Sequence, residues 1–113
     1  MEVLAASKLL STSIRDSREF LEYKRLKDSV YQDEALKGML KRYKLLKFKY
    51  ETQLIAKEEP DENLKGELSA LTEALSFNNK AAEYLNAEYK LTSLINEVYR
   101  MIGDACELDI DVF

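Results

Sequence analysis

Residues able to do catalytic or metal chemistry are scarce, because the 113-residue chain contains no histidine and a single cysteine, Cys106. The lack of histidine excludes Ser-His and Cys-His nucleophile pairs, histidine-bearing zinc sites and the Glu-x-x-His ligands of di-iron bundles. One thiolate is also too few for an iron–sulfur cluster, which normally needs four. We therefore predict a noncatalytic protein without metal or cofactor, in which Cys106 is a passive, partly packed thiol.

Glu88 is a carboxylate on an otherwise apolar helical stripe that includes Tyr84 and Leu91. Burial can raise the pKa of such a group and make it a general acid. A carboxylate alone on such a stripe more often meets a cation or a tyrosine from another helix or chain. We expect Glu88 to fix helix register or partner choice rather than to catalyse.

A run of basic residues without any acid extends from residue 37 to 49, with aromatic residues interleaved. This pattern superficially resembles a surface that grips a nucleic-acid backbone. However, the formal net charge of the chain is −4, which argues against a wholly electrostatic grip on nucleic acid or anionic lipid. Lys37, Lys41 and Lys44 share one helical face, which we interpret as an ordinary polar face, with contact to phosphate or an acidic partner as the alternative.

The elements that carry these residues are predicted to be helices. Three glycines and one proline are too few turn formers for a many-stranded fold. Apolar periodicity predicts a small all-α bundle of about five helices, some of them long, antiparallel and coiled-coil-like. We expect a single domain over 1–105, followed by a short acidic and apolar tail over 106–113. The amino terminus lacks the pattern of a signal peptide and no apolar run approaches about 20 residues. We therefore expect a cytoplasmic protein without membrane insertion.

Capping residues and breakers locate the helix ends. After a first helix over 2–14, Ser13, Asp16 and Ser17 offer side-chain oxygens to free backbone N–H groups. Asp16 with Glu19 three residues later predicts a capping box at the start of a second helix, which is either separate from the first or joined to it by a bend. Asp33 is a predicted N-cap for a third helix over 34–57. Pro60 marks the next loop, and the pair Asn78 and Asn79 is predicted to end a fourth helix and begin a fifth over 80–105.

Apolar stripes on these helices predict what they bury. The first helix carries Val3, Ala6, Leu10 and Ile14 on one face, and the fourth carries a heptad pattern of Leu64, Leu68, Leu71 and Leu75. The third helix has a main seam and a second apolar row, Leu40, Leu45, Phe48 and Ile55, which predicts packing against more than one neighbour.

We expect the third, fourth and fifth helices to mediate self-association, most simply as a dimer. The predicted partner or oligomer interface contains Tyr43, Leu46, Tyr50, Leu54, Tyr84, Glu88, Leu91 and Ile95. Two other functions fit the same pattern. One is a prefoldin-like or holdase chaperone module that shields apolar segments, and the other is direct RNA binding through the Lys37 to Lys49 face.

The residue pattern of the fifth helix is also similar to that of a known protein family. The string from Asn78 to Leu91, continued by Ser93, Leu94, Ile95, Glu97, Val98, Ile102, Gly103 and Ala105, resembles the YlbF/YmcA family, and its YlbF branch in particular. Similar residues are placed upstream at Leu10, Ile14, Ser17, Tyr23, Asp33, Ala35, Tyr43, Lys47, Tyr50 and Glu51, so the resemblance covers nearly the whole chain.

This resemblance implies a small cytoplasmic all-α bacterial protein that acts as a regulatory subunit without enzymatic activity. It implies association with related YlbF/YmcA-type proteins and a YaaT-type partner, and links to competence, sporulation, biofilm formation and mRNA maturation through endoribonuclease Y. YlbF-like chains can carry a cysteine-rich tail implicated in iron–sulfur cluster binding. This chain has Cys106 alone, which places cluster ligation by it in doubt.

Overall fold

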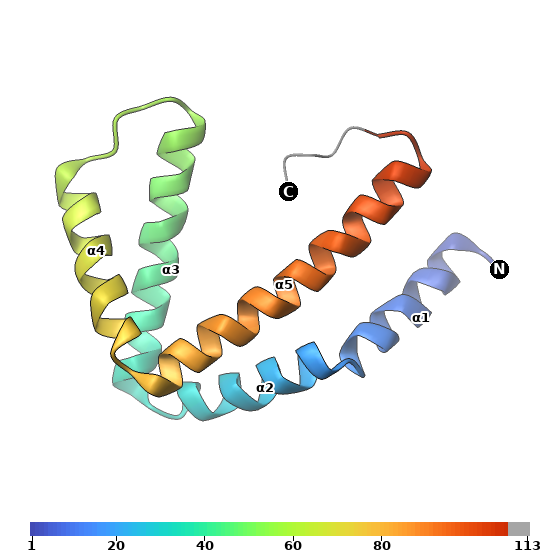
Figure 1. Cartoon of the computed structure of the whole chain (residues 1–113), viewed down its shortest axis with the longest axis horizontal. Helices are drawn as coiled ribbons and strands as arrows, with labels where there is room; N and C mark the ends of the chain where they lie inside the picture. Colours follow the sequence, from blue (N-terminus) through green and yellow to red (C-terminus); the bar gives the residue numbers. More distant parts are fainter. Residues whose placement is uncertain (109–113) are drawn as a thin grey trace. The chain divides into compact units, whose positions relative to one another are not determined.

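The computed structural model describes residues 1–108 of the chain, and five α-helices account for most of them (Figure 1). In chain order the helices are α1 (Val3–Arg15), α2 (Arg18–Tyr31), α3 (Glu34–Ile55), α4 (Glu62–Ser76) and α5 (Asn79–Ala105). No strand occurs in this part of the chain, so the all-α prediction is confirmed. Of the predicted tail, residues 109–113 lie outside the described residues.

The chain divides into two compact units, and the division falls within α2 and α5. The first unit contains residues 1–26 and the chain from Leu85 onward, and the second contains Lys27–Tyr84. The first therefore holds α1, most of α2 and most of α5. The second holds α3 and α4 with one end each of α2 and α5.

Side-chain caps explain where the helices begin. The Asp33 carboxylate accepts a hydrogen bond from the Leu36 backbone N–H at 3.1 Å, so the predicted cap of α3 is confirmed. Asp61 caps α4 in the same manner, and the Asn78 side-chain oxygen accepts from the Ala81 N–H at 3.0 Å at the start of α5. The cap of α2 is different from the predicted one: it is the Ser17 hydroxyl that accepts from the Phe20 N–H.

Ser17 acts as the cap because α1 continues to Arg15, which leaves Asp16 in the helical C-cap position of α1. The Ser17 hydroxyl also donates to the carbonyl of Ile14, so it bridges the end of one helix and the start of the next. The two segments are therefore separate helices.

Helix α3 ends in a left-handed turn. Lys57 has φ of 60°, and the Glu58 N–H donates to the Gln53 carbonyl at 2.9 Å across it. This is the hydrogen bond of a Schellman motif, whose left-handed position is usually glycine. Pro60 follows in the loop and is buried.

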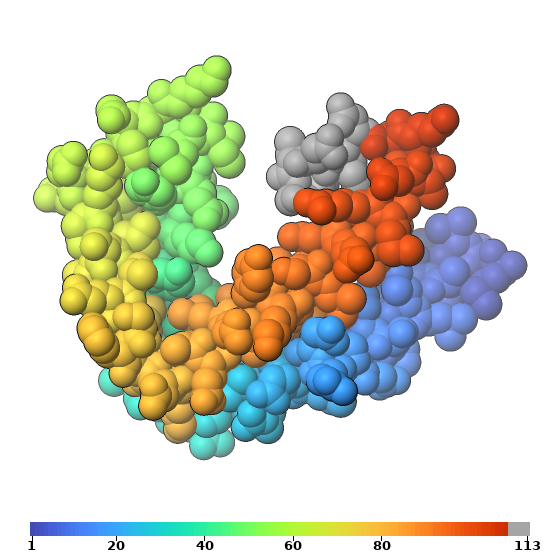
Figure 2. Space-filling model, viewed as in Figure 1, coloured from blue at the N-terminus to red at the C-terminus, as the bar shows by residue number. Residues whose placement is uncertain are grey.

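The second unit has a well-formed core around the hairpin of α3 and α4, which lie side by side and run in opposite directions (Figure 1). Its buried apolar residues are Val30, Leu36, Leu40, Leu46, Leu64, Leu75, Ala81 and Tyr84. In the space-filling view, the atoms of α3 and α4 form a continuous surface (Figure 2). The leucine seams of both helices thus pair within one chain.

The first unit buries few apolar side chains. Among its described residues only Leu26, Ala87 and Leu91 are buried apolar positions. None of the 13 residues of α1 is buried, so the predicted stripe of this helix faces no core, although Ile14 is half-buried. The Glu19 side chain of α2 lines the same shallow depression as Tyr89 and Glu97 of α5, which places the start of α2 beside the middle of α5.

Candidate functional site

Tyr84, near the start of α5, is the centre of a cluster of aromatic and basic side chains in the second unit. Its side chain is fully buried, and its ring lies 6.1 Å from that of Tyr31, between centroids. The Lys44 ammonium donates a hydrogen bond to the Tyr84 hydroxyl oxygen at 2.8 Å and lies 5.0 Å from the ring centroid. Lys27 and Lys37 lie 5.6 and 5.8 Å from the centre of the Tyr31 ring.

This cluster uses two of the three residues of the predicted basic face. The Lys37 and Lys44 ammonium groups contact tyrosine rings, and both side chains are half-buried. Lys41 is exposed. The sequence contained one signal for this arrangement, since a tyrosine on an apolar stripe needs a hydrogen-bond partner for its hydroxyl. Helical periodicity within α3 could not identify that partner.

Arg42 forms a two-pronged ion pair with Glu67 that joins α3 to α4. Its Nε and one terminal nitrogen each lie 2.9 Å from a different Glu67 carboxylate oxygen. The hydrogen bond from Arg42 lowers the pKa of Glu67, and the charges of Arg42 and Lys49 act in the same direction. Because both side chains are nearly half exposed, water screens this attraction, and the pair orients the two helices more than it stabilises them.

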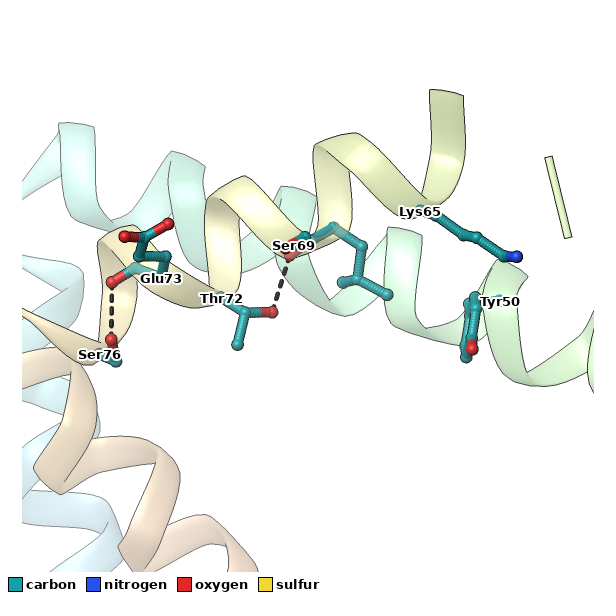
Figure 3. Close-up of a pocket in the computed structure, with 7 residues that line it drawn as sticks. Tyr50, Lys65, Ser69, Thr72, Glu73 and Ser76 are labelled. Carbon is teal, nitrogen blue, oxygen red and sulfur yellow. Dashed lines mark hydrogen bonds between the residues drawn. The ribbon is translucent and has the colours of Figure 1, made fainter. Parts of the chain in front are cut away.

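A shallow depression of about 620 Å³ lies along the α3–α4 hairpin (Figure 3). Tyr50 and Lys65 lie at one end of it, and Glu73 and Ser76 at the other. The Thr72 hydroxyl donates to the carbonyl of Leu68, and the Ser76 hydroxyl to that of Glu73, each at 2.7 Å. Both hydroxyls are therefore engaged with the backbone of α4, and the depression lacks an activated nucleophile among these groups.

The eight residues of the predicted interface occupy different environments. Leu46, Tyr84 and Leu91 are buried within the chain, so they contribute to its own core. Tyr43, Tyr50, Glu88 and Ile95 are half-buried, and Leu54 is exposed. The interface prediction therefore depends on these last five residues, of which Glu88 and Ile95 belong to the first unit.

Cys106 is exposed just beyond the end of α5, so the prediction that its thiol is partly packed is wrong. Within residues 1–108, no group of three or more cysteine or acidic side chains is arranged to hold a metal ion. Over the same residues, no helix has the length and apolar character needed to cross a bilayer.

Exposed apolar side chains are the most distinctive feature of the surface. Among the described residues, 16 large apolar side chains are exposed, whereas 11 hydrophobic residues are buried. Eleven of the exposed ones belong to the first unit, which buries only three. The other five are Leu45, Phe48, Leu54, Ile55 and Phe77 in the second unit.

The fold and the surface define a class of small all-helical proteins with exposed apolar helix faces, and large patches of that kind are typical of binding surfaces. Over residues 3–107, the chain matches the family described as "Control of competence regulator ComK, YlbF/YmcA". The chain belongs to this YlbF/YmcA family, which confirms the resemblance noted in the sequence.

Two curated relatives show the extent of the similarity. A UPF0342 protein of Caldicellulosiruptor bescii is 32% identical over 98 residues, covering 87% of this chain and 82% of the relative. A UPF0342 protein of Halothermothrix orenii is 28% identical over 101 residues, covering 89% of this chain and 86% of the relative.

Two solved structures share the fold. A protein of unknown function (DUF964) from Bacillus stearothermophilus has a TM-score of 0.75 and 19% identity, covering 93% of this chain and 92% of that one. A chain from the crystal structure of Bacillus subtilis RicA in complex with RicF has a TM-score of 0.62 and 24% identity, covering 93% of both chains. At these identities the likeness establishes the fold alone.

Proposed function

We propose that this protein is a noncatalytic regulatory adaptor that self-associates and binds partner proteins through exposed helical surfaces. The observation that carries the proposal is the imbalance in the first unit, which exposes eleven large apolar side chains and buries three apolar residues. A unit with so small a core gains stability when a second chain covers its apolar side chains, because burial of apolar surface drives both folding and association.

The sequence predicted self-association through the third, fourth and fifth helices. Because Leu46, Tyr84 and Leu91 of that predicted interface are buried within the chain, we now propose a surface on α1 and α5. In α1, Val3, Leu4, Leu9 and Leu10 are all exposed. In α5, Ile102 is exposed and Ile95 is half-buried, and both follow the stripe that carries Glu88. A carboxylate beside such a surface can select a partner by its charge.

Family membership supports the regulatory part of the proposal. The family description names control of a competence regulator, and RicA, whose fold this chain shares, was crystallised with RicF. We extend the proposal to related YlbF/YmcA-type proteins and a YaaT-type protein as partners. Sporulation, biofilm formation and endoribonuclease Y-dependent mRNA maturation are the processes that the family resemblance suggests.

Affinity purification from the native host, followed by mass spectrometry, tests these partners: recovery of related helical proteins or a ribonuclease is the expected result.

Sedimentation equilibrium over a range of protein concentrations tests self-association, with helicity on dilution measured in parallel by circular dichroism. We expect a dimer that dissociates on dilution and loses helicity as it does so. A variant with Leu4→Glu and Ile102→Glu should be monomeric. Ile55→Glu with Phe77→Glu, an equal change of charge at exposed positions of the second unit, is the matched control and should remain dimeric. A wild-type monomer at micromolar concentration with unchanged helicity would contradict the proposal.

The holdase alternative makes a different prediction from the same surfaces. A holdase suppresses aggregation of unrelated unfolded proteins, whereas an adaptor protects no unrelated client. Suppression of citrate synthase aggregation on heating, at a stoichiometric ratio, distinguishes the two. We expect none, because the apolar surface of the first unit is covered in the dimer.

A further inference from the structure

The face of α3 that points away from the α3–α4 core carries an apolar stripe of its own. Leu45, Phe48, Thr52 and Ile55 are spaced three, four and three residues apart, which places them on one side of the helix. Leu45 is 45% exposed, Phe48 68% and Ile55 83%. The Thr52 hydroxyl donates to the Phe48 carbonyl at 2.8 Å, so its polar group is satisfied and its methyl group remains for packing.

This stripe is distinct from the seam that holds the hairpin together. The buried residues of α3 are Leu36, Leu40 and Leu46. Leu36 and Leu46 occupy the opposite side of the helix, and Leu40 lies between the two sides. The sequence pattern predicted that the row containing Leu45, Phe48 and Ile55 would pack against a second neighbour. In the structure Leu40 of that row is buried, whereas these three side chains are exposed.

Basic residues lie on the stripe and on its α4 side. Helix α3 carries six basic and two acidic residues, a net charge of +4 against −4 for the whole chain. Lys41 precedes Leu45 on the stripe itself, and Lys49 lies on the side of α3 that faces Glu67 of α4. Of the nearby acids on α4, Glu67 is already bound to Arg42. The stripe thus lies on a helix with an excess of positive charge, and the acids near it, Glu51, Glu58 and Glu59, are grouped toward its Ile55 end.

We propose that this outer face of α3, defined by Lys41, Leu45, Phe48, Lys49 and Ile55, docks an acidic amphipathic helix of a partner protein. The inference rests on the proposed adaptor function and specifies the surface and the chemistry of one partner. The heptad-like spacing fits the side chains of an approaching helix, and Lys41 and Lys49 fit carboxylates beside its apolar stripe.

Gly38 favours close approach at the start of this face. It lies seven residues before Leu45 on the same side of α3, and a Cβ atom placed there would meet nothing within 4 Å.

A nucleic acid fits the face less well than a helix does. Phe48 offers one ring for a base to stack on, but Leu45 and Ile55 offer none, and phosphates would leave these two side chains uncovered.

A designed peptide pair tests the charge and apolar parts of the proposal. The first peptide has about 21 residues in three heptads, with leucine at the a and d positions and glutamate at e and g. The second is identical but has lysine at e and g. In fluorescence anisotropy with the full chain, we expect the glutamate peptide to bind at least about tenfold more tightly than the lysine peptide. Equal binding, or no binding of the glutamate peptide, would overturn the proposal.

Two variants with matched controls locate the binding face. Lys41→Glu with Lys49→Glu should reverse the preference between the peptides, whereas Lys8→Glu with Lys80→Glu, the same charge change elsewhere, should not. Phe48→Ser should weaken binding of the glutamate peptide about tenfold or more, and Phe77→Ser should not, although the Phe77 side chain is 80% exposed. Circular dichroism confirms that each variant remains helical. Equal effects in variant and control would refute the assignment to α3.

The same variants separate this inference from the proposed function. If Phe48→Ser loses peptide binding and remains dimeric, both stand. If Phe48→Ser also becomes monomeric, the face binds a second copy of this chain, and the partner helix is refuted. If the wild-type chain is monomeric but binds the glutamate peptide as expected, only self-association fails. If a single-stranded RNA of about 20 nucleotides displaces the peptide with a steep salt dependence, the face binds nucleic acid instead.

Discussion

Removal of the Tyr84 hydroxyl tests whether the contact between α5 and α3 stabilises the second unit. In Tyr84→Phe the ring remains buried against Tyr31, but the Lys44 ammonium loses the acceptor that lies 2.8 Å away. A hydrogen bond to a charged group contributes about 1.5–3 kcal/mol. Because Lys44 is half-buried and its ammonium can regain water, we expect a loss of about 1.5 kcal/mol in the free energy of unfolding.

Urea unfolding at a fixed protein concentration, followed by circular dichroism at 222 nm, measures this loss. For a slope of about 1–3 kcal/mol per molar urea, the transition midpoint should fall by roughly 0.5–1.5 M. Tyr89→Phe is the matched control, since Tyr89 is 71% exposed, and its midpoint should not move.

A double-mutant cycle attributes the loss to the pair. Lys44→Met removes the donor and retains most of the aliphatic side chain. If Tyr84 and Lys44 stabilise each other, the double variant should be less destabilised than the sum of the single variants by about 1 kcal/mol. A coupling energy below about 0.3 kcal/mol would refute the reasoning, because the two residues would then contribute independently.

Three further predictions concern the α3–α4 hairpin. Lys57→Gly should raise the free energy of unfolding by about 0.5–1 kcal/mol, because glycine adopts a φ of 60° without steric cost, and Lys47→Gly within the helix should lower it by a similar amount. Gly38→Ala should raise it by about 0.5–1 kcal/mol in thermal unfolding, since the new methyl group enters open space, and a decrease would show that the position is covered. The pKa of Glu67 is lower in the folded state than its ordinary value of 4.5. The ion pair with Arg42 therefore stabilises the fold fully at a pH above 4.5, and this stabilisation is lost as the pH falls through the folded-state pKa. The unfolding midpoints of wild type and Glu67→Gln should therefore converge as the pH falls below 4.5, and a constant difference would contradict the linkage.

Local signals in the sequence were sufficient for the helices themselves. Asp33 caps α3 because its carboxylate accepts from a backbone N–H three residues later, an interaction that needs no contact from elsewhere in the chain. Where two caps competed, local reasoning was less successful. Asp16 and Ser17 both offered oxygens, and the exact end of α1 decided that Ser17 caps α2.

The functional surface was less predictable, because it depends on which stripes find a neighbour. The apolar residues of α1 and the second row of α3 have the same spacing as the core stripes, so periodicity alone predicts that all of them are buried. In the structure the stripe of α1 faces no core, and Phe48 is exposed on α3. Exposure of these stripes is the property that the proposed adaptor uses.

The amino-acid sequence by itself determined that this chain is helical, where most of its helices begin, and which family it resembles. These properties follow from turn residues, caps and apolar periods that act over a few neighbouring positions. Only the tertiary structure decided that Lys44 reaches Tyr84, 40 residues away, and that α1 and the outer face of α3 are uncovered. The physical reason is that burial depends on contacts between segments distant in the chain, and a periodic stripe does not specify which segment covers it.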